Sequence, residues 1–454
     1  MKNSNSKEVK ADAVTVKEKF SYALVNLGNI PITALTSSFL LIFYTNVVGL
    51  DPKACGTLFL IARVLDGLND PIVGFFIDHL PNTKHGHFRP PLIVGTILCS
   101  INFLLLWFGP LFFPVFKLGI AYITYLLLGV LFPVMDISLN SLLPVMTTDV
   151  DERNSLSTVK GVVYMVGMMI LNIVAPIVID DTNEASGYII VILAALAVVV
   201  GCSLVGTLGV RERVQPQTTE KYSIKDMFRI LAQRPVWVMF LASLLMTVGM
   251  FVSNTVNTYF FTYIIGDFSL FGIASAASMI CLFPAMLVSG KLVNKFGKKT
   301  MFIAGLLCMT LFPLLRLIAV DNLPLIFICT GLVGFGQGLT MPLSYGMQAD
   351  NTDYVELKTG LRGEAAIASL SSLITKCAMG IGGAIPAYLL GFVGFDSSLA
   401  QQPDAVKQMI IVCVLIVPAL FTVVGAVIMG AGYPLGKEAL EKQNEQMNQI
   451  HGKA

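Results

Sequence analysis

Two acidic residues lie four positions apart inside an apolar stretch of the N-terminal part of the chain. Asp66 and Asp70 fall within Ala62–Pro71 (ARVLDGLNDP), and long hydrophobic runs flank this string. Residues four apart share one face of a helix, and two carboxylates this close repel each other unless a positive charge lies between them. A monovalent cation, a proton or a lysine would supply that charge. We interpret the pair as a coupling-ion site, with a structural ion-pair network as the alternative.

Three further charged residues lie inside apolar runs, namely Arg63, Asp136 and Lys376. A charge at the bilayer centre costs at least about 2.5–3.5 kcal/mol on insertion scales, so it usually faces a cavity or a partner. Together with the aspartate pair they comprise two positive and three negative charges, which leaves one net negative charge. One bound monovalent cation would neutralise the set, and so would one proton on an aspartate. We expect this coupling ion, H+ or Na+, and no other cofactor.

Hydrophobic residues make up 55% of the 454 residues, and charged residues make up only 13%. A water-soluble domain needs roughly a quarter of its residues charged, so the composition excludes a soluble protein. A membrane-spanning helix needs about 20 mostly apolar residues. The sequence holds twelve such runs and therefore predicts an all-α membrane protein with twelve transmembrane helices: 20–48, 54–77, 92–111, 118–146, 156–180, 187–209, 236–265, 270–293, 300–319, 324–349, 364–393 and 406–431.

Lysine and arginine gather in the N-terminal tail and in alternate loops, a bias that marks the cytoplasmic side. Both termini are therefore predicted to be cytoplasmic, in the inner membrane of a bacterium. A basic loop separates six predicted spans from six, and its stretch Tyr222–Leu231 predicts a short surface helix. Two-lobed transporters of this kind bind substrate between the lobes. The predicted segments are a tail (1–19), a six-helix lobe (20–209), the middle loop (210–235), a second six-helix lobe (236–431) and a solvated tail (432–454).

Hydroxyl and amide side chains are frequent in the first, seventh and tenth predicted spans, for example Asn29, Asn257 and Gln337. They suit a polyhydroxylated solute, because each sugar hydroxyl both donates and accepts, and they equally suit hydrogen bonds between helices. No histidine falls within a predicted span, and no HExxH or GxSxG motif occurs. We therefore expect no enzyme. Arg316, near the outer end of its span, is predicted to extend to the membrane interface.

Several longer strings are similar to one transporter family and together cover most of the chain. They are FYTNVVGL (43–50), GTLFLIARVLDGLNDPIVG (56–74), TKHGHFRP (83–90), TYFFTYIIGD (258–267) and ADNTDYVELKTG (349–360). Through these strings the chain resembles the glycoside–pentoside–hexuronide:cation symporters of the major facilitator superfamily, typified by the melibiose permease. The resemblance implies symport of a sugar or glycoside with a monovalent cation by alternating access, in a monomer that binds no nucleic acid. A lipid or lysolipid carrier of the same fold is the alternative, since animal relatives of this family move lipids.

The resemblance also implies roles for matching residues. Asp66 and Asp70 match the family's cation-site acids. The expected substrate-binding residues are Asp136, Lys376, Asn29, Asn140, Thr375, Met341 and Phe132. The expected gating residues at the cytoplasmic face are Arg153, Asp350, Asp353, Glu356 and Arg362.

The chain departs from the melibiose permease at several of these positions. Ile30 replaces an aspartate that grips the sugar, Pro133 replaces a threonine at the sodium site, and Lys160 replaces an arginine. Phe132 replaces a tyrosine, and Asn140 and Met341 each replace a tryptophan. We therefore expect a substrate other than melibiose, with H+ and Na+ as alternative coupling ions. Loss of the aspartate favours a hexuronide, because that acid would repel a carboxylated sugar, and a neutral sugar held elsewhere is the alternative.

Overall fold

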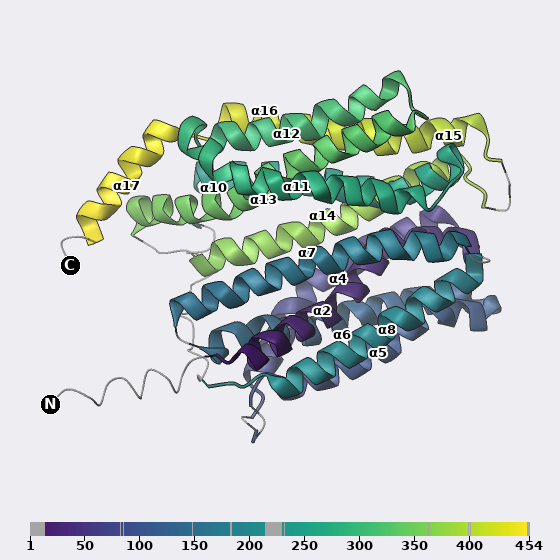
Figure 1. Cartoon of the computed structure of the whole chain (residues 1–454), viewed down its shortest axis with the longest axis horizontal. Helices are drawn as coiled ribbons and strands as arrows, with labels where there is room; N and C mark the ends of the chain where they lie inside the picture. Colours follow the sequence, from purple (N-terminus) through teal and green to yellow (C-terminus); the bar gives the residue numbers. More distant parts are fainter. Residues whose placement is uncertain are drawn as a thin grey trace. The chain divides into compact units, whose positions relative to one another are not determined.

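Helices make up nearly all of the chain that the structure describes (Figure 1). The structure is a computed structural model, and it describes residues 14–81, 83–84, 86–147, 149–181, 184–213, 229–230, 232–360, 364–397, 399 and 401–451. Within these residues, β-structure is limited to one isolated bridge between Thr83 and Gly86. The prediction of an all-α protein is confirmed.

The chain divides into two compact units, Met1–Thr219 and Glu220–Ala454. The described helices of the first unit are α2 (Val16–Ser38), α3 (Leu40–Ile42), η1 (Phe43–Val47), α4 (Pro52–Asp78), α5 (Arg89–Phe112), η2 (Pro114–Phe116), α6 (Lys117–Met146), α7 (Val150–Asp181) and α8 (Glu184–Gly209). Those of the second unit are α10 (Arg234–Phe260), η3 (Phe261–Ile265), α11 (Leu270–Phe296), α12 (Lys298–Leu315), η4 (Arg316–Ile318), α13 (Leu323–Thr359), α14 (Glu364–Phe392), α15 (Asp404–Ile411), η5 (Val412–Ile416), α16 (Val417–Gly432) and α17 (Lys437–His451).

Ten helical segments among the described residues are long and apolar enough to cross a membrane. The bent pair Val16–Ser38 and Leu40–Val47, which turns by 54°, provides an eleventh. Helix α4 has 27 residues, but Arg63, Asp66 and Asp70 interrupt its apolar run. Each of the twelve predicted spans therefore coincides with helix, and α4 differs from the others through the charges that it carries.

Polar contacts hold both ends of the first span. At its start, Thr15 and Glu18 form a capping box, in which Thr15 N donates to Glu18 Oε2 at 2.9 Å and Glu18 N donates to Thr15 Oγ1 at 3.3 Å. At its far end the chain passes through the π-helical turn η1. There Lys117 Nζ donates to the carbonyl oxygens of Val48 and Gly49, at 2.9 and 2.7 Å. The helix between these ends is fixed in position along its axis.

Helix α6 is central to the packing of the first unit, where it contacts α2, α4, α5 and α7. Helix α2 packs in turn against α7 and α8. An aromatic cluster of Phe43, Trp107 and Tyr188, each at most 1% exposed, joins the end of the first span to α5 and α8. Large aromatic side chains contribute strongly to cores of this kind, so the elements around α6 are firmly placed.

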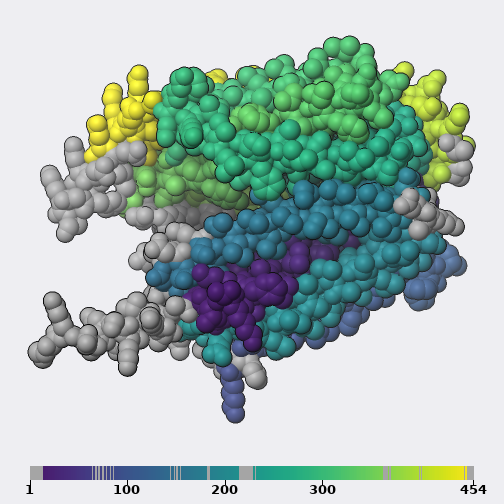
Figure 2. Space-filling model, viewed as in Figure 1, coloured from purple at the N-terminus to yellow at the C-terminus, as the bar shows by residue number. Residues whose placement is uncertain are grey.

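The terminal segments differ from the sequence prediction. Helix α2 begins at Val16, inside the predicted tail 1–19. The second tail forms α17, seen at one end of the second unit (Figures 1 and 2). Gln443 of α17 is 4% exposed and its amide donates to the Asp350 carbonyl oxygen at 2.7 Å, while Leu440 packs against the core. Much of the tail is therefore docked rather than solvated.

Two further predictions concern the segment Tyr222–Leu231 and the residue Arg316. The predicted surface helix Tyr222–Leu231 lies outside the described residues, apart from helical residues 229–230. The prediction for Arg316 was wrong, since this residue is only 6% exposed and its guanidinium lies 4.8 Å from the centroid of the Phe260 ring. A face-on aromatic ring is a favourable neighbour for a cation, which explains how the charge is accommodated inside the unit.

Candidate functional site

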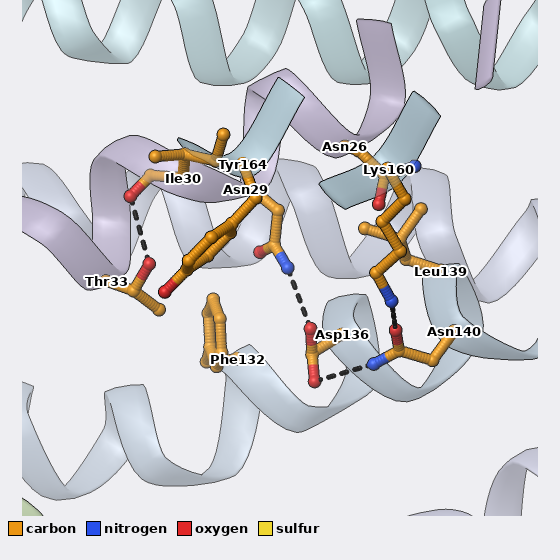
Figure 3. A pocket seen from close by; sticks show the side chains of 10 residues that line it. All are labelled: Asn26, Asn29, Ile30, Thr33, Phe132, Asp136, Leu139, Asn140, Lys160 and Tyr164. Atoms are coloured by element: carbon orange, nitrogen blue, oxygen red, sulfur yellow. Dashed lines mark hydrogen bonds between the residues drawn. The ribbon is translucent and has the colours of Figure 1, made fainter. Parts of the chain in front are cut away.

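A cavity of about 290 Å³ lies among α2, α6 and α7 of the first unit (Figure 3). Its lining residues follow helical spacing on each element, so that one face of each helix contributes. They are Asn26, Asn29, Ile30 and Thr33 of α2, Phe132, Asp136, Leu139 and Asn140 of α6, and Lys160 and Tyr164 of α7. Four predicted substrate residues, Asn29, Phe132, Asp136 and Asn140, are thus brought together.

A chain of hydrogen bonds crosses the cavity wall (Figure 3). Asn29 Nδ2 donates to Asp136 Oδ1 at 2.7 Å, and Asn140 Nδ2 donates to Asp136 Oδ2 at 3.0 Å. Lys160 Nζ donates in turn to Asn140 Oδ1. Both carboxylate oxygens of Asp136 therefore accept from an amide, and Asn140 links the carboxylate to the ammonium group.

The remaining lining groups give the cavity a mixed character. Asn29 Oδ1 is buried and has no hydrogen-bond partner within the described structure, so it is an unsatisfied acceptor in the cavity wall. The Tyr164 ring is 47% exposed, and the Phe132 ring also faces the cavity (Figure 3). Ile30, the residue that replaces the family's sugar-binding acid, lines the cavity and is 2% exposed. The site therefore combines polar groups with aromatic and aliphatic surface.

The predicted cation site lies on α4, which packs against α6. Asp66 is 8% exposed, and its Oδ2 accepts from Arg63 Nη1 at 2.8 Å. Arg63 Nη2 also donates to Tyr125 OH of α6 at 3.3 Å. The side chain of Asp70 lies outside the described part of the structure. The positive charge beside Asp66 among the described residues is thus the guanidinium of its own helix.

Helices α4 and α6 approach each other closely at Gly129. Asn69 Nδ2 donates to the Gly129 carbonyl oxygen at 3.0 Å, and a Cβ atom at position 129 would lie 2.0 Å from Asp66 Oδ1. Glycine therefore leaves room for the carboxylate in its observed position, and any larger residue would require the carboxylate to shift. A second cavity, of about 480 Å³, adjoins Asp66 and Asn69 and is otherwise lined by Gly129 and apolar side chains of α4 and α6.

The other predicted substrate residues belong to the second unit. Lys376 is partly buried on α14, where its neighbour Thr375 donates through Oγ1 to the Ser371 carbonyl oxygen at 3.0 Å. Met341 lies on α13 and is 40% exposed. Gln348 Nε2 donates to Ser371 Oγ at 3.2 Å and so connects α13 with α14. Each of these residues belongs to the second unit.

The predicted gating residues lie at helix ends. Asp350 accepts from Lys298 Nζ at 2.7 Å, an ion pair between α13 and α12. Arg153 Nε donates to the Thr147 carbonyl oxygen at 2.8 Å, just beyond the end of α6. Asp353 and Glu356 belong to the last turns of α13, and Arg362 lies outside the described residues.

Two residues that line the cavity, Lys160 and Tyr164, were not predicted as site residues from the sequence. Lys160 was recognised in the sequence only as a replacement for an arginine, and Tyr164 was not singled out. Their spacing of four within the span 156–180 is the signal that would have placed them on one helix face. That this face meets Asn140 of α6 depends on how α7 is rotated, which the sequence pattern leaves open.

Comparison with known proteins shows the class of protein to which the chain belongs. A solved structure of the nucleoside transporter NupG matches with a TM-score of 0.67 at 12% identity, over 92% of this chain and 99% of that one. An isoprimeverose transporter of Lactiplantibacillus pentosus is 30% identical over 86% of this chain and 83% of its own length. A glucuronide carrier protein homolog of Escherichia coli is 29% identical over 91% of both chains. The fold and these relatives define a multi-span membrane transporter of the major facilitator superfamily rather than an enzyme.

The family follows from a match over most of the sequence. The model of the family described as "MFS/sugar transport protein" matches residues 21–437. The chain belongs to this family, and the resemblance to its glycoside symporters is confirmed.

Proposed function

We propose that this secondary transporter carries a sugar or glycoside into the cell together with one monovalent cation, H+ or Na+, by alternating access. The observation that carries the proposal is the polar cavity of the first unit. There Asn29, Asp136, Asn140 and Lys160 lie beside the Tyr164 ring.

The cavity suits a carbohydrate by both its chemistry and its size. Sugar hydroxyls donate and accept, and the wall contains the unsatisfied acceptor Asn29 Oδ1 together with the ammonium donor of Lys160. The rings of Phe132 and Tyr164 suit the apolar faces of a sugar. The volume of about 290 Å³ lies near the lower limit of about 300 Å³ for small-molecule sites. A lysolipid, the alternative substrate, has a long acyl chain and fits this polar cavity poorly.

We assign the coupling ion to Asp66 and Asp70 of α4. A cation bound there would relieve the repulsion between the two acids. The arrangement of α6 supports a link to the sugar cavity, because Gly129 lies against Asp66 and Asp136 follows seven residues later. Seven residues span about 10.5 Å of helix, so the two groups share one rigid element. Mutual enhancement of binding by typical couplings of about 1–3 kcal/mol would follow.

The remaining assignments rest on the sequence. Lys376 of the second unit is proposed to contribute to substrate binding, and the Lys298–Asp350 pair to gating at the cytoplasmic face. The lysine and arginine bias supports an inner-membrane location with both termini in the cytoplasm.

The test is uptake into energised membrane vesicles. Labelled galactosides, xylosides, glucuronides and a lysolipid are each offered under an imposed sodium gradient and then under a proton gradient. We expect one glycoside to accumulate under one gradient, and Asp66→Asn to abolish accumulation while exchange of the sugar at equal concentrations persists. Transport of the lysolipid with no gradient-dependent uptake of any sugar would contradict the proposal.

A further inference from the structure

Two of the ten residues that line the cavity carry a formal charge, Asp136 and Lys160. They do not contact each other directly, whereas Arg63 and Asp66 of α4 form a direct ion pair with an N–O distance of 2.8 Å. The amide of Asn140 stands between them instead, accepting from Lys160 Nζ and donating to Asp136 Oδ2 (Figure 3). The ammonium group is thus held by a neutral amide, and the Asp136 carboxylate lies nearby without touching it directly.

The two charges differ in how far their hydrogen-bonding capacity is used. Asp136 accepts at both oxygens, from Asn29 and from Asn140. A lysine ammonium has three N–H donors, and the structure shows one of them engaged, toward Asn140 Oδ1. Two donors of a positive group therefore remain for a ligand in the cavity.

An anionic group of a ligand would bind to this ammonium group more favourably than a hydroxyl would. A hydroxyl would accept one hydrogen bond but would bring no charge to the ammonium group, whose hydrogen-bond contact among the described residues is a neutral amide. A carboxylate or sulfonate would accept from the free N–H groups and neutralise the charge. Because lysine acts as a compact point charge rather than a planar fork, planar and tetrahedral anions both suit it.

We infer that the transported solute is a sugar carrying one anionic substituent, a carboxylate or a sulfonate, and that the Lys160 ammonium binds this substituent. The inference rests on the proposed function and deepens it by naming the substrate class. Asn140 is a positioning residue in this scheme, since it keeps Lys160 away from Asp136 and leaves the ammonium open to the ligand.

The inference has an electrical consequence. One monovalent cation together with one monoanionic sugar carries no net charge across the membrane. A neutral sugar with the same cation would carry one positive charge, and a potential of about 100 mV, negative inside, would then multiply its accumulation ratio by about 50. Accumulation of the anionic sugar would instead be independent of the potential.

The first experiment measures specificity in proteoliposomes that contain the full chain. Methyl glucoside, methyl glucuronide and the 6-sulfonated methyl glucoside differ only at the sixth carbon of the sugar, and their uptake is compared under one ion gradient. We expect wild type to prefer at least one of the two anionic sugars over the glucoside by about tenfold or more. The comparison of glucuronide with sulfonated sugar shows which anion is the natural one.

Variants connect the preference to Lys160. Lys160→Gln should lose the preference while still transporting the glucoside, which also shows that the variant is folded, and Lys160→Arg should keep most of it. Lys407→Gln, which removes a lysine of α15 outside the cavity, is the matched control and should leave the ratio unchanged. A wild-type preference for the glucoside, or an equal loss for all three sugars in Lys160→Gln, would overturn the inference.

The second experiment needs no variant. A potassium diffusion potential is imposed with valinomycin while the coupling-ion gradient is held constant. Constant accumulation of the preferred anionic sugar supports the inference, and a rise toward 50-fold overturns it even if the sugar is transported. If no sugar accumulates under any gradient, the proposed function itself fails, a result distinct from both of these.

Discussion

Two charged clusters of the first unit, one on α4 and one between α6 and α7, are arranged in opposite ways. On α4, Arg63 and Asp66 pair directly within one helix, with N–O contact at 2.8 Å. Between α6 and α7, Asp136 and Lys160 are joined only through the amide of Asn140. Direct pairing compensates both charges, whereas the bridged arrangement leaves donors of the ammonium group open. The bridged cluster therefore keeps donors available for the proposed charged ligand, whereas the proposed cation would have to compete with Arg63 for Asp66.

The largest expected effect comes from removing the acid of the bridged cluster. Asp136→Ala leaves Asn29 and Asn140 without their common acceptor, so that Asn140 also holds Lys160 less firmly. Hydrogen bonds to a charged group contribute about 1.5–3 kcal/mol each. We expect sugar affinity to fall by about 100-fold or more, measured by isothermal titration calorimetry. Thr33→Val, which changes the same cavity without touching this chain of bonds, is the control. An affinity within threefold of wild type in Asp136→Ala would contradict the assignment.

The second largest effect is expected from breaking the Arg63–Asp66 ion pair on α4. Arg63→Gln leaves Asp66 in a largely buried position without its partner, and breaking a buried pair costs about 3–5 kcal/mol. Because the two side chains are 20% and 10% exposed, we expect about 2–3 kcal/mol of lost stability, measured by thermal unfolding in detergent.

The double variant Arg63→Gln/Asp66→Asn completes this test. It should recover most of the loss, because no unpaired charge remains, giving a coupling of about 1–3 kcal/mol in the double-mutant cycle. Additive single effects would show that the contact carries little energy.

The bridged cluster can also be converted into a direct pair. Asn140→Asp is nearly isosteric and places a carboxylate beside the Lys160 ammonium. The substitution also removes the hydrogen bond to Asp136 and places two carboxylates side by side. We expect affinity for an anionic sugar to fall by about tenfold while affinity for the matched neutral sugar changes less, since the added negative charge compensates Lys160 and repels an anionic ligand. Calorimetric titration with both sugars measures this, and an unchanged ratio would count against the role of the bridge.

The smallest effect is expected at the contact between α4 and α6. In Gly129→Ala the new methyl group meets Asp66 Oδ1, and a shift of the carboxylate relieves the overlap. Overpacking at its lower limit costs about 1 kcal/mol, which corresponds to a cation affinity about fivefold weaker, measured from the cation dependence of uptake. Gly161→Ala has open space around the added atom and is the matched control. Equal behaviour of the two variants would refute the close contact.

The helical fold could be predicted because a long apolar run that crosses a membrane has few structural alternatives to a helix. The involvement of Asn29, Asp136 and Asn140 in a site could also be predicted, because polar side chains are unusual in such runs. The amide bridge to Lys160 was not predictable, because it depends on the rotation and spacing of α6 and α7. The burial of Arg316 beneath Phe260 and the docking of α17 through Gln443 were missed for the same reason. Contacts between helices are set by packing that a single sequence does not reveal.

The placement of both clusters along α6 bears on how such a transporter diversifies. Phe132, Asp136, Leu139 and Asn140 line the proposed solute cavity, while Gly129 lies about one turn before Phe132 and against Asp66. If the proposed function holds, mutations at the lining positions would change the imported nutrient and leave the contact between Gly129 and the proposed ion-binding acid in place. A library randomised at positions 132, 136, 140 and 160 would then explore new substrates while the proposed ion site stays unchanged.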